Sequence, residues 1–195
     1  CKNSSRDEVP CQPFADTRQE LLNIENNWQV DDSLLLKAQI ARSVDVTENG
    51  DDVALASVVS GTDSFFKTTK DTYLLQANYK LNESVYWVVG SEYYNDKVKS
   101  SSDFLATSRE NMAWFGQMVV ELGDFDFQLG LRNDDNEAFG SHNTQSLAFG
   151  YQVSETSKVI ASWGTAFRAP TFNDLYWPAD PFGIGNVDLT PEESE

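Results

Sequence analysis

The sequence predicts an all-β fold, an antiparallel segment of a transmembrane β-barrel. Apolar and polar residues alternate over runs of about 10–14 residues, longer than an ordinary strand of about 5–6 and long enough to cross a bilayer at a tilt. The connections between runs alternate between short and long, as in outer-membrane barrels. Aromatic residues gather near the run ends, as expected where a membrane meets water: Trp28, Tyr93, Tyr94, Trp114, Phe125, Phe127 and Trp163.

Eight strands are expected, and two-residue alternation justifies each of them. Their approximate ranges are 17–30, 34–45, 71–81, 85–95, 111–122, 125–132, 145–153 and 158–167. Short turns are expected at 31–33, 82–84, 123–124 and 154–157, and long loops at about 46–70, 96–110, 133–143 and after 167. A soluble antiparallel sandwich with long strands is the alternative, but it gives no reason for this asymmetry between the two ends.

The alternation also predicts which side chains face lipid and which face the lumen of the barrel. The apolar stripe, expected to face lipid, includes Val120, Leu129, Leu131, Leu147 and Phe149. The polar stripe, expected to line the lumen, includes Lys37, Gln39, Gln76, Asn78, Lys80, Gln117, Gln128 and Arg132.

The length and net charge of the chain argue against several classes of binding partner. The chain has 195 residues, with 14 Lys plus Arg against 31 Asp plus Glu, a net charge of −17. This balance argues against nucleic acid and against an anionic membrane surface as partners, because both require a basic surface. No apolar run approaches the roughly 18 residues of a spanning helix. No signal peptide or initiator Met is evident, so we expect residues 1–195 to be an internal piece of one barrel domain.

The chain contains two cysteines, Cys1 and Cys11, and we expect them to form a local disulfide in a surface loop. A metal site would need two further ligands nearby, and none is present. The alternative is that one or both cysteines are unpaired. A bond between them would indicate an oxidising compartment.

No catalytic pattern emerges, and we do not expect an enzyme. The single histidine, His142, lies between polar residues and is predicted to be a solvated loop residue. Paired carboxylates, such as Asp31-Asp32 and Asp134-Asp135, occur in expected turns and loops and are interpreted as solvated. The sequence has no phosphate-binding glycine loop and no His-Glu-x-x-His motif.

The expected loop between the second and third strands is unusually acidic. It contains Asp45, Glu48, Asp51, Asp52 and Asp63, without Lys or Arg among residues 44–66. Its start resembles an EF-hand loop, but the twelfth position is Ala56, so it is not an EF-hand. We predict a Ca²⁺ site formed by Asp45, Asp51, Asp52 and Asp63. A solvated acidic loop is the alternative.

A pair of motifs near the end of the chain carries a family resemblance. Residues 163–176 contain Trp-Gly-x-x-Phe-Arg-Ala-Pro and then Leu-Tyr, and residues 185–192 read Gly-Asn-x-x-Leu-x-Pro-Glu. Pro170 is expected to end a strand, residues 173–176 to form a helical turn, Gly185-Asn186 to bend with positive φ, and Pro191 to precede the next strand. Together, Arg168-Ala169-Pro170 and Gly185-Asn186 with Pro191 resemble the motifs of TonB-dependent outer-membrane receptors. We expect Arg168 to order its loop and not to bind ligand.

Three upstream segments resemble the cobalamin (vitamin B12) receptor branch of this family: residues 16–19, 123–127 and 132–142. The resemblance implies about eight strands and the start of a ninth from a barrel of about 22, with the plug domain and final strands outside the chain. It further implies a Gram-negative outer membrane with lipopolysaccharide, extracellular loops, a plug that contacts TonB, and no required cofactor. Cobalamin is the implied cargo, and some members bind Ca²⁺ through acidic loops. A ferric siderophore or another metal chelate is the alternative cargo, and an outer-membrane enzyme or adhesion barrel is a third reading.

Overall fold

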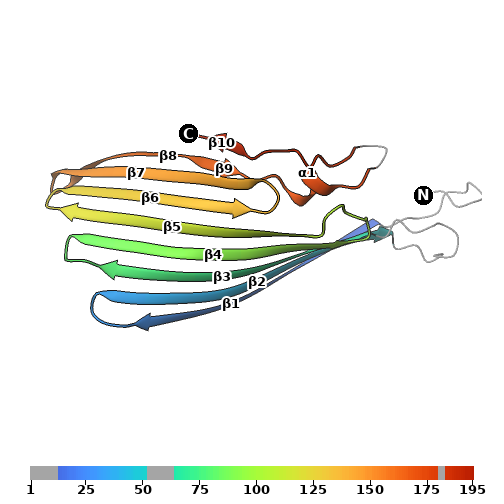
Figure 1. The fold of residues 1–195 in the computed structure, drawn as a ribbon, viewed down its shortest axis with the longest axis horizontal. Helices are drawn as coiled ribbons and strands as arrows, with labels where there is room; N and C mark the ends of the chain where they lie inside the picture. The colour runs from blue at the N-terminus through green and yellow to red at the C-terminus, as the bar shows by residue number, and fades with distance from the viewer. Residues whose placement is uncertain (1–12, 52–63, 180–182) are drawn as a thin grey trace, which may run out of the picture.

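One antiparallel sheet of eight strands dominates the computed structural model, which describes residues 13–51, 64–179 and 183–195 (Figure 1). Every strand pairs only with its neighbours along the chain, in the order β1 to β8. The strands are β1 (Pro13–Gln29), β2 (Leu34–Asp51), β3 (Ser64–Lys80), β4 (Val85–Ser100), β5 (Ser108–Leu122), β6 (Phe125–Asn136), β7 (Gly140–Ser154) and β8 (Ser157–Gly164). The predicted antiparallel all-β fold is therefore confirmed.

Three smaller elements follow the sheet. β9 (Ala166–Arg168) pairs antiparallel with β10 (Glu192–Ser194), and α1 (Phe172–Tyr176) lies between them in the chain. In Figure 1, α1 lies near the end of the sheet opposite the short turns. The helical turn after Pro170 and the strand after Pro191 were both predicted.

The short turns follow the local chemistry that the sequence contains. Asp31 Oδ1 accepts hydrogen bonds from the backbone N–H groups of Ser33 and Leu34, at 2.7 and 2.9 Å. Such side-chain bonds to nearby backbone favour a turn over a continued strand. Gly123, in the two-residue turn between β5 and β6, has φ of +61°, which costs glycine little and other residues much more. All four short connections therefore gather at one end of the sheet, as predicted.

The predicted long loops are wrong in extent, because the strands continue into them. β2 reaches Asp51, β4 reaches Ser100, and β6 and β7 leave only residues 137–139 between them instead of 133–143. The ladder of backbone pairs continues there while both faces carry polar residues, so the alternation that marks a half-apolar strand disappears. We call this end of the sheet the long-connection end.

The register separates two faces. Lys37, Gln76, Gly90, Phe115 and Arg132 form one continuous cross-strand row over β2 to β6, on what we call the inner face. The predicted lumen residues all lie on this face. The predicted lipid-facing residues all lie on the opposite, outer face, where the rows Met118–Leu129–Leu147 and Val120–Phe127–Phe149 run across β5 to β7.

The outer face presents a broad apolar band. Along β3 and the residue that follows it, this band runs from Tyr73 to Leu81, about 26 Å along the chain, or about 20 Å in height at a tilt of about 40°. That height is close to the roughly 25 Å expected of an outer-membrane barrel. Leu75 is 63% exposed and Leu131 54%, so these apolar side chains have no protein cover in the sheet. Above the band, β2 continues for eleven residues beyond Ile40 and ends at Asp51.

Few apolar side chains of the described residues are buried. A small cluster of Val98, Phe104 and Phe172 lies at the long-connection end, with Phe66, Tyr176 and Trp177 packed against it. No helix within residues 13–51, 64–179 and 183–195 is long and apolar enough to span a membrane. Packing in this chain thus concentrates where α1 meets the sheet.

Candidate functional site: the inner face

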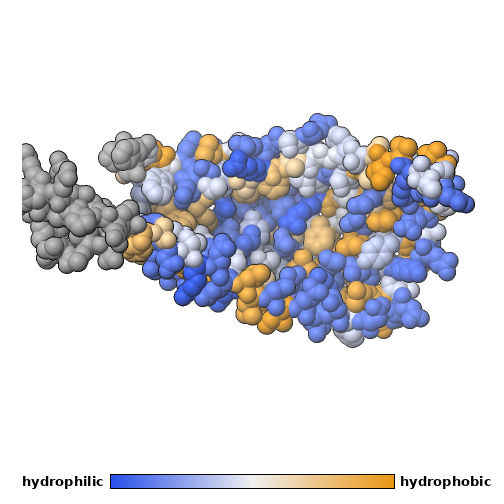
Figure 2. Space-filling model, turned by 180° about the vertical axis from the view of Figure 1, so that it is seen from behind, coloured by the Kyte–Doolittle hydropathy of each residue, from blue (hydrophilic) through white to orange (hydrophobic). Residues whose placement is uncertain are grey.

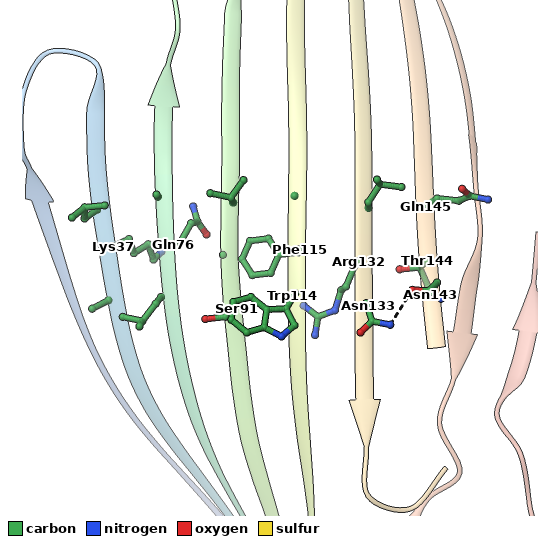
Figure 3. A pocket seen from close by; sticks show the side chains of 18 of the residues that line it. Lys37, Gln76, Ser91, Trp114, Phe115, Arg132, Asn133, Asn143, Thr144 and Gln145 are labelled. Atoms are coloured by element: carbon green, nitrogen blue, oxygen red, sulfur yellow. Dashed lines mark hydrogen bonds between the residues drawn. The ribbon is translucent and has the colours of Figure 1, made fainter. Parts of the chain in front are cut away.

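The inner face is hollowed and rich in polar side chains. Lys37, Gln76, Phe115, Arg132 and Thr144 extend from five strands in one cross-strand row over the middle of this face (Figure 3). Figure 2, viewed from behind Figure 1, shows a molecule hollowed along its middle, with mostly hydrophilic residues there. A cavity of about 1030 Å³ also borders this row, but most of its lining side chains, Trp28, Leu75 and Trp114 among them, belong to the outer face. Amide, hydroxyl and charged groups are therefore available on the inner face to hydrogen-bond whatever fills the lumen.

A glycine on the inner face leaves room for an aromatic ring. Gly90 lies opposite Phe115 on β5, and a Cβ at Gly90 would lie 2.5 Å from Phe115 Cζ and 2.7 Å from the carbonyl oxygen of Leu75. The aromatic ring thus covers the place where a side chain would stand. The glycine is required by this close approach, since its φ is not positive.

Arg132 joins two carboxylates on different strands. Its Nη2 donates to Glu92 Oε1 on β4 at 2.8 Å, and its Nε and Nη2 donate to Asp134 Oδ2 and Oδ1, each at 2.8 Å. The guanidinium passes over β5 at Ala113, whose side chain is fully buried. A planar fork of donors fits this bidentate geometry, which a lysine would not reproduce.

Buried amides extend this network toward the long-connection end. Asn111 Nδ2 donates to Asp134 Oδ1 at 3.0 Å, and Asn136 Nδ2 donates to Asn111 Oδ1 at 3.1 Å. Asn111, Asp134 and Asn136 are each at most 5% exposed. Buried polar groups with these partners fix the positions of β5 and β6 relative to each other. The prediction that Asp134 is a solvated loop residue is wrong, because β6 extends to Asn136 and carries its side chain into this buried network. Glu92 was not predicted as a site residue, although its inner-face parity could be counted from the short turn at 82–84.

A segment after β9 crosses this face. We call residues 169–177 the strap. Arg109 Nη1 on β5 donates to the carbonyl oxygen of Pro170 at 2.7 Å, and its guanidinium lies 4.8 Å from the ring centre of Phe172. At the other end of the strap, the N–H of Leu105 donates to the carbonyl oxygen of Tyr176 at 3.2 Å. These contacts hold the strap against the ends of β4 and β5.

The strap is ordered by its own capping interactions. Thr171 Oγ1 accepts from the N–H of Asp174 at 3.2 Å, and the Thr171 N–H donates to Asp174 Oδ2 at 2.9 Å. This reciprocal capping box starts α1, and the bond from the Thr171 backbone lowers the pKa of Asp174.

The predicted positive φ at Gly185 is wrong, because the described glycines with positive φ are Gly123 and Gly140. A Cβ at Gly185 would lie 2.5 Å from Trp177 N, so the closeness of the strap backbone explains this glycine. Beside it, the N–H of Asn186 donates to the carbonyl oxygen of Asp174 at 2.8 Å.

A second cavity, of about 480 Å³, lies between the strap and β2 to β5. Its charged lining includes Asp45, Lys70, Asp96 and Arg109, and its aromatic lining includes Phe66 and Phe172. Arg109 Nε pairs with Asp96 Oδ2 at 3.3 Å, and Lys70 Nζ lies 3.5 Å from the ring centre of Tyr94. The lining offers both donors and acceptors, which suits a polar ligand of low net charge.

Residues 3–195 match the family model described as TonB dependent receptor-like, beta-barrel. The chain belongs to this family. Its members are receptors and not a class of enzymes. The sheet is therefore part of a TonB-dependent receptor barrel. That its outer face meets lipid stays a prediction, which the exposed apolar band on that face supports.

Relatives and solved structures agree with this assignment. The chain is 33% identical over 185 residues to the vitamin B12 transporter BtuB of Photobacterium profundum, covering 94% of the chain and 29% of the relative. It is 38% identical over 96 residues to BtuB of Vibrio vulnificus, covering 49% of the chain and 15% of that relative. The chain thus spans less than a third of the length of either transporter.

Two solved structures share the fold at low sequence identity. The copper transporter OprC has a TM-score of 0.72 at 14% identity, covering 91% of this chain and 35% of OprC. The FrpB iron transporter from Neisseria meningitidis (F3-3 variant) has a TM-score of 0.67 at 17% identity, covering 80% of this chain and 28% of FrpB.

Only some of the predicted calcium ligands lie among the residues that the structure describes. Asp45 lies on β2 at the inner face, whereas Glu48, three residues further along, lies on the outer face. Asp51 is the last residue of β2, and Asp52 and Asp63 lie outside the described residues, as do Cys1 and Cys11. Within the described part of the receptor, no three His, Cys, Asp or Glu side chains cluster as metal ligands do. The calcium site and the disulfide remain predictions.

The family-motif residues lie around the strap. Arg168 on β9 faces Glu192 on β10, with 3.7 Å between Nη1 and Oε2, and both side chains are largely exposed. His142 differs from its prediction, because it lies in β7 with its side chain 18% exposed. Its ring packs against Phe139 and Phe167, at centroid distances of 5.5 and 5.2 Å. The strand extends further than the alternation indicated, so the expected loop histidine is packed beside β9.

Proposed function

We propose that this chain forms part of the wall of an outer-membrane receptor that imports cobalamin, driven by TonB through a plug domain outside the chain. One observation carries the proposal: the 33% identity to a vitamin B12 transporter, which extends over 94% of the chain. In this proposal the membrane is that of a Gram-negative bacterium, and the long-connection end faces the cell exterior.

The two halves of the inner face have different roles in this proposal. The row around Gln76 and Arg132 lies at the height of the apolar band, where a plug would fill the lumen and hydrogen-bond to the wall. The strap and its cavity lie nearer the exterior and meet the cargo. Cobalamin is large and carries many neutral carboxamide groups, and the mixed donors and acceptors around Asp45, Lys70 and Arg109 suit such groups.

The test uses the full-length receptor that contains this segment, purified in detergent. Binding of cyanocobalamin and of a ferric siderophore is measured by calorimetry on the same preparation. We expect cyanocobalamin to bind and the siderophore not to bind. Binding of the siderophore alone would replace the proposed cargo.

A cavity variant tests the site. Asp45→Asn combined with Lys70→Gln should weaken cobalamin binding at least tenfold, because the loss of even one charge-assisted hydrogen bond costs about 1.5–3 kcal/mol and about 1.4 kcal/mol is a factor of ten. Glu155→Gln, an exposed residue in the turn between β7 and β8, is the matched control and should bind as the wild type does. Equal affinity in all three proteins would remove this cavity from the cargo site.

A further inference from the structure

Lys70 lines the cavity between the strap and the sheet with its ammonium group confined and its hydrogen bonds unused. Its Nζ lies 3.5 Å from the ring centre of Tyr94, and Oδ1 of Asp96 is 3.9 Å away, too far for a hydrogen bond. In residues 13–51, 64–179 and 183–195 no acceptor takes a hydrogen bond from this nitrogen, whereas Lys37 Nζ lies 2.6 Å from Glu25 Oε2. The three N–H donors of Lys70 are therefore available to a ligand in the cavity.

No tight ion pair holds this ammonium, so the ring of Tyr94 is its main restraint. Asp96 is shared between two cations, since its Oδ2 pairs with Arg109 Nε at 3.3 Å while Lys70 approaches its Oδ1. Asp45, another carboxylate in the cavity lining, forms no ion pair with the described residues. A cation within about 6 Å of a ring centre is attracted to the aromatic face, and 3.5 Å is well inside that range. The position of the Lys70 charge thus depends on Tyr94.

Tyr94 itself stands on a well-fixed part of the wall. It lies on β4 two residues from Asp96, the cross-strand partner of Lys70, and so diagonally across from the lysine. On β5 the residue opposite Tyr94 is Asn111, which is 1% exposed and hydrogen-bonded within the buried amide network. The ring therefore projects from the section of the sheet that these buried amides hold in register.

From this arrangement we propose that Tyr94 is a positioning residue, which holds the Lys70 ammonium against the wall so that it can donate to carbonyl oxygens of the cargo. A lysine side chain has many rotamers, and a ligand that binds a free one has to restrict them. The ring restricts Lys70 beforehand, so less entropy is lost when the cargo binds. Carboxamide oxygens suit this ammonium, because Asp96 and Asp45 offset its attraction for an anion. The cargo in this inference rests on the proposed function, whereas the hold of the ring on Lys70 does not.

The hold of the ring is tested without cargo. The lysines of the full-length receptor in detergent are reductively methylated with isotope-labelled methyl groups, which keeps their charge, and the methyl signals are recorded by NMR. Lys70→Arg identifies the Lys70 signal by its absence. We expect this signal upfield of the other lysine signals, because the ring current shields a group above a ring centre. The upfield position should disappear in Tyr94→Leu and Tyr94→Gln, two variants without the ring, and persist in Tyr94→Phe.

Calorimetry with cyanocobalamin tests the consequence for binding. Tyr94→Leu and Tyr94→Gln should weaken binding about two- to tenfold, the cost of restricting one long side chain, and Tyr94→Phe should bind as the wild type does. In a Lys70→Gln background, Tyr94→Leu should change the affinity little, because the group that the ring positions is gone. Tyr93→Leu makes the same change one residue away on the outer face, and this matched control should leave the affinity unchanged.

Several results would overturn the proposal. One is a Lys70 signal that is not shifted upfield, or that keeps its position when the ring is removed. Another is an equal loss of affinity in Tyr94→Phe, or a loss in the Lys70→Gln background as large as in the wild type, because the effect of Tyr94 would then belong to the structure of the wall. A receptor that shows the upfield Lys70 signal and binds no cyanocobalamin would contradict the proposed function and still confirm that Tyr94 holds Lys70.

Discussion

Arg109 and Pro170 are 61 residues apart in the chain, yet the guanidinium of Arg109 donates to the carbonyl oxygen of Pro170 at 2.7 Å. This contact links the Arg-Ala-Pro segment of the family motif to the end of β5. Arg109 is only 13% exposed and also pairs with Asp96, so its guanidinium is held from both β4 and the strap. The strap is therefore anchored by one side chain that is itself fixed by an ion pair.

Replacing that side chain should release the strap without unfolding the sheet. Arg109→Gln removes a charge-assisted hydrogen bond and a cation–π contact, together about 1.5–3 kcal/mol of local stability. Amides of residues 171–177 should exchange with deuterium about 10- to 100-fold faster in the full-length receptor, as measured by mass spectrometry. Arg168→Gln is the control, because its exposed ion pair contributes little. Unchanged exchange in the Arg109 variant would contradict the anchoring role.

Gly90 and Gly116 make a matched pair for testing the close approach on the inner face. Gly90→Ala would force a Cβ against Phe115 and against the backbone oxygen of Leu75, and the backbone cannot move aside. We expect a loss of about 1–3 kcal/mol, measured as a lower thermal transition of the full-length receptor in detergent. Gly116→Ala meets its nearest atom at 4.0 Å and should leave the transition within about 0.5 kcal/mol of wild type. Adding Phe115→Ala should rescue Gly90→Ala only in part, because the contact with Leu75 remains.

The strap should loosen in acid. The Thr171 N–H donates to the Asp174 carboxylate and lowers the pKa of Asp174, so the charged form is favoured in the folded strap. A lowered pKa gives stability that is fully present above the unfolded value of about 3.9 and is lost as pH falls through the folded value. Protection of residues 171–177 against hydrogen exchange, corrected for the intrinsic rate, should therefore be higher at pH 6 than at pH 3. Asp174→Asn should remove this difference in protection between pH 6 and pH 3. If the difference persists in the variant, a titrating group other than Asp174 is its cause.

Spin labels should distinguish the two faces of the sheet. In the full-length receptor in bilayers, labels at Leu129, Leu131 and Leu147 should be accessible to lipid-soluble oxygen, as should labels at Val120 and Phe149. Leu131 is 54% exposed and Leu147 39% in the sheet, which leaves lipid as their cover. Gln128 lies on the opposite face, one residue from Leu129, and a label there is the control. If the label at Gln128 were accessible to oxygen and the label at Leu129 to a water-soluble quencher, the assignment of the two faces would be reversed.

The sequence could predict the fold wherever one face of a strand is apolar. Along β6, Phe125, Phe127, Leu129 and Leu131 alternate with polar residues, and both the strand and its facing were predicted. The same strand continues through Asn133 to Asn136, where both faces are polar and the period of two carries no signal. The strand ends were missed for this reason at β2, β4 and β6. At the start of β3, Phe65 and Phe66 are adjacent and lie on opposite faces, so they too give no alternation.

The candidate site was less predictable, because it depends on contacts between distant segments. The strap could be expected as a helical turn from residues 173–176, but its contact with Arg109 is not encoded in any local pattern. Gly185 was expected to serve a bend, and the structure instead shows its missing side chain making room for Trp177. His142 was assigned to a loop since the extension of β7 could not be anticipated.

The pairing of neighbours along the chain has a consequence for how this wall is built. Each strand from β2 to β8 pairs with the strand that precedes it in the chain, so hairpins can be added one after another from β1 to β8. The strap cannot reach Arg109 until three further strands and β9 are in place. A slip of one residue in any of their registers would turn side chains to the wrong face and displace Pro170. The docked strap thus depends on the register of every strand between residues 109 and 170.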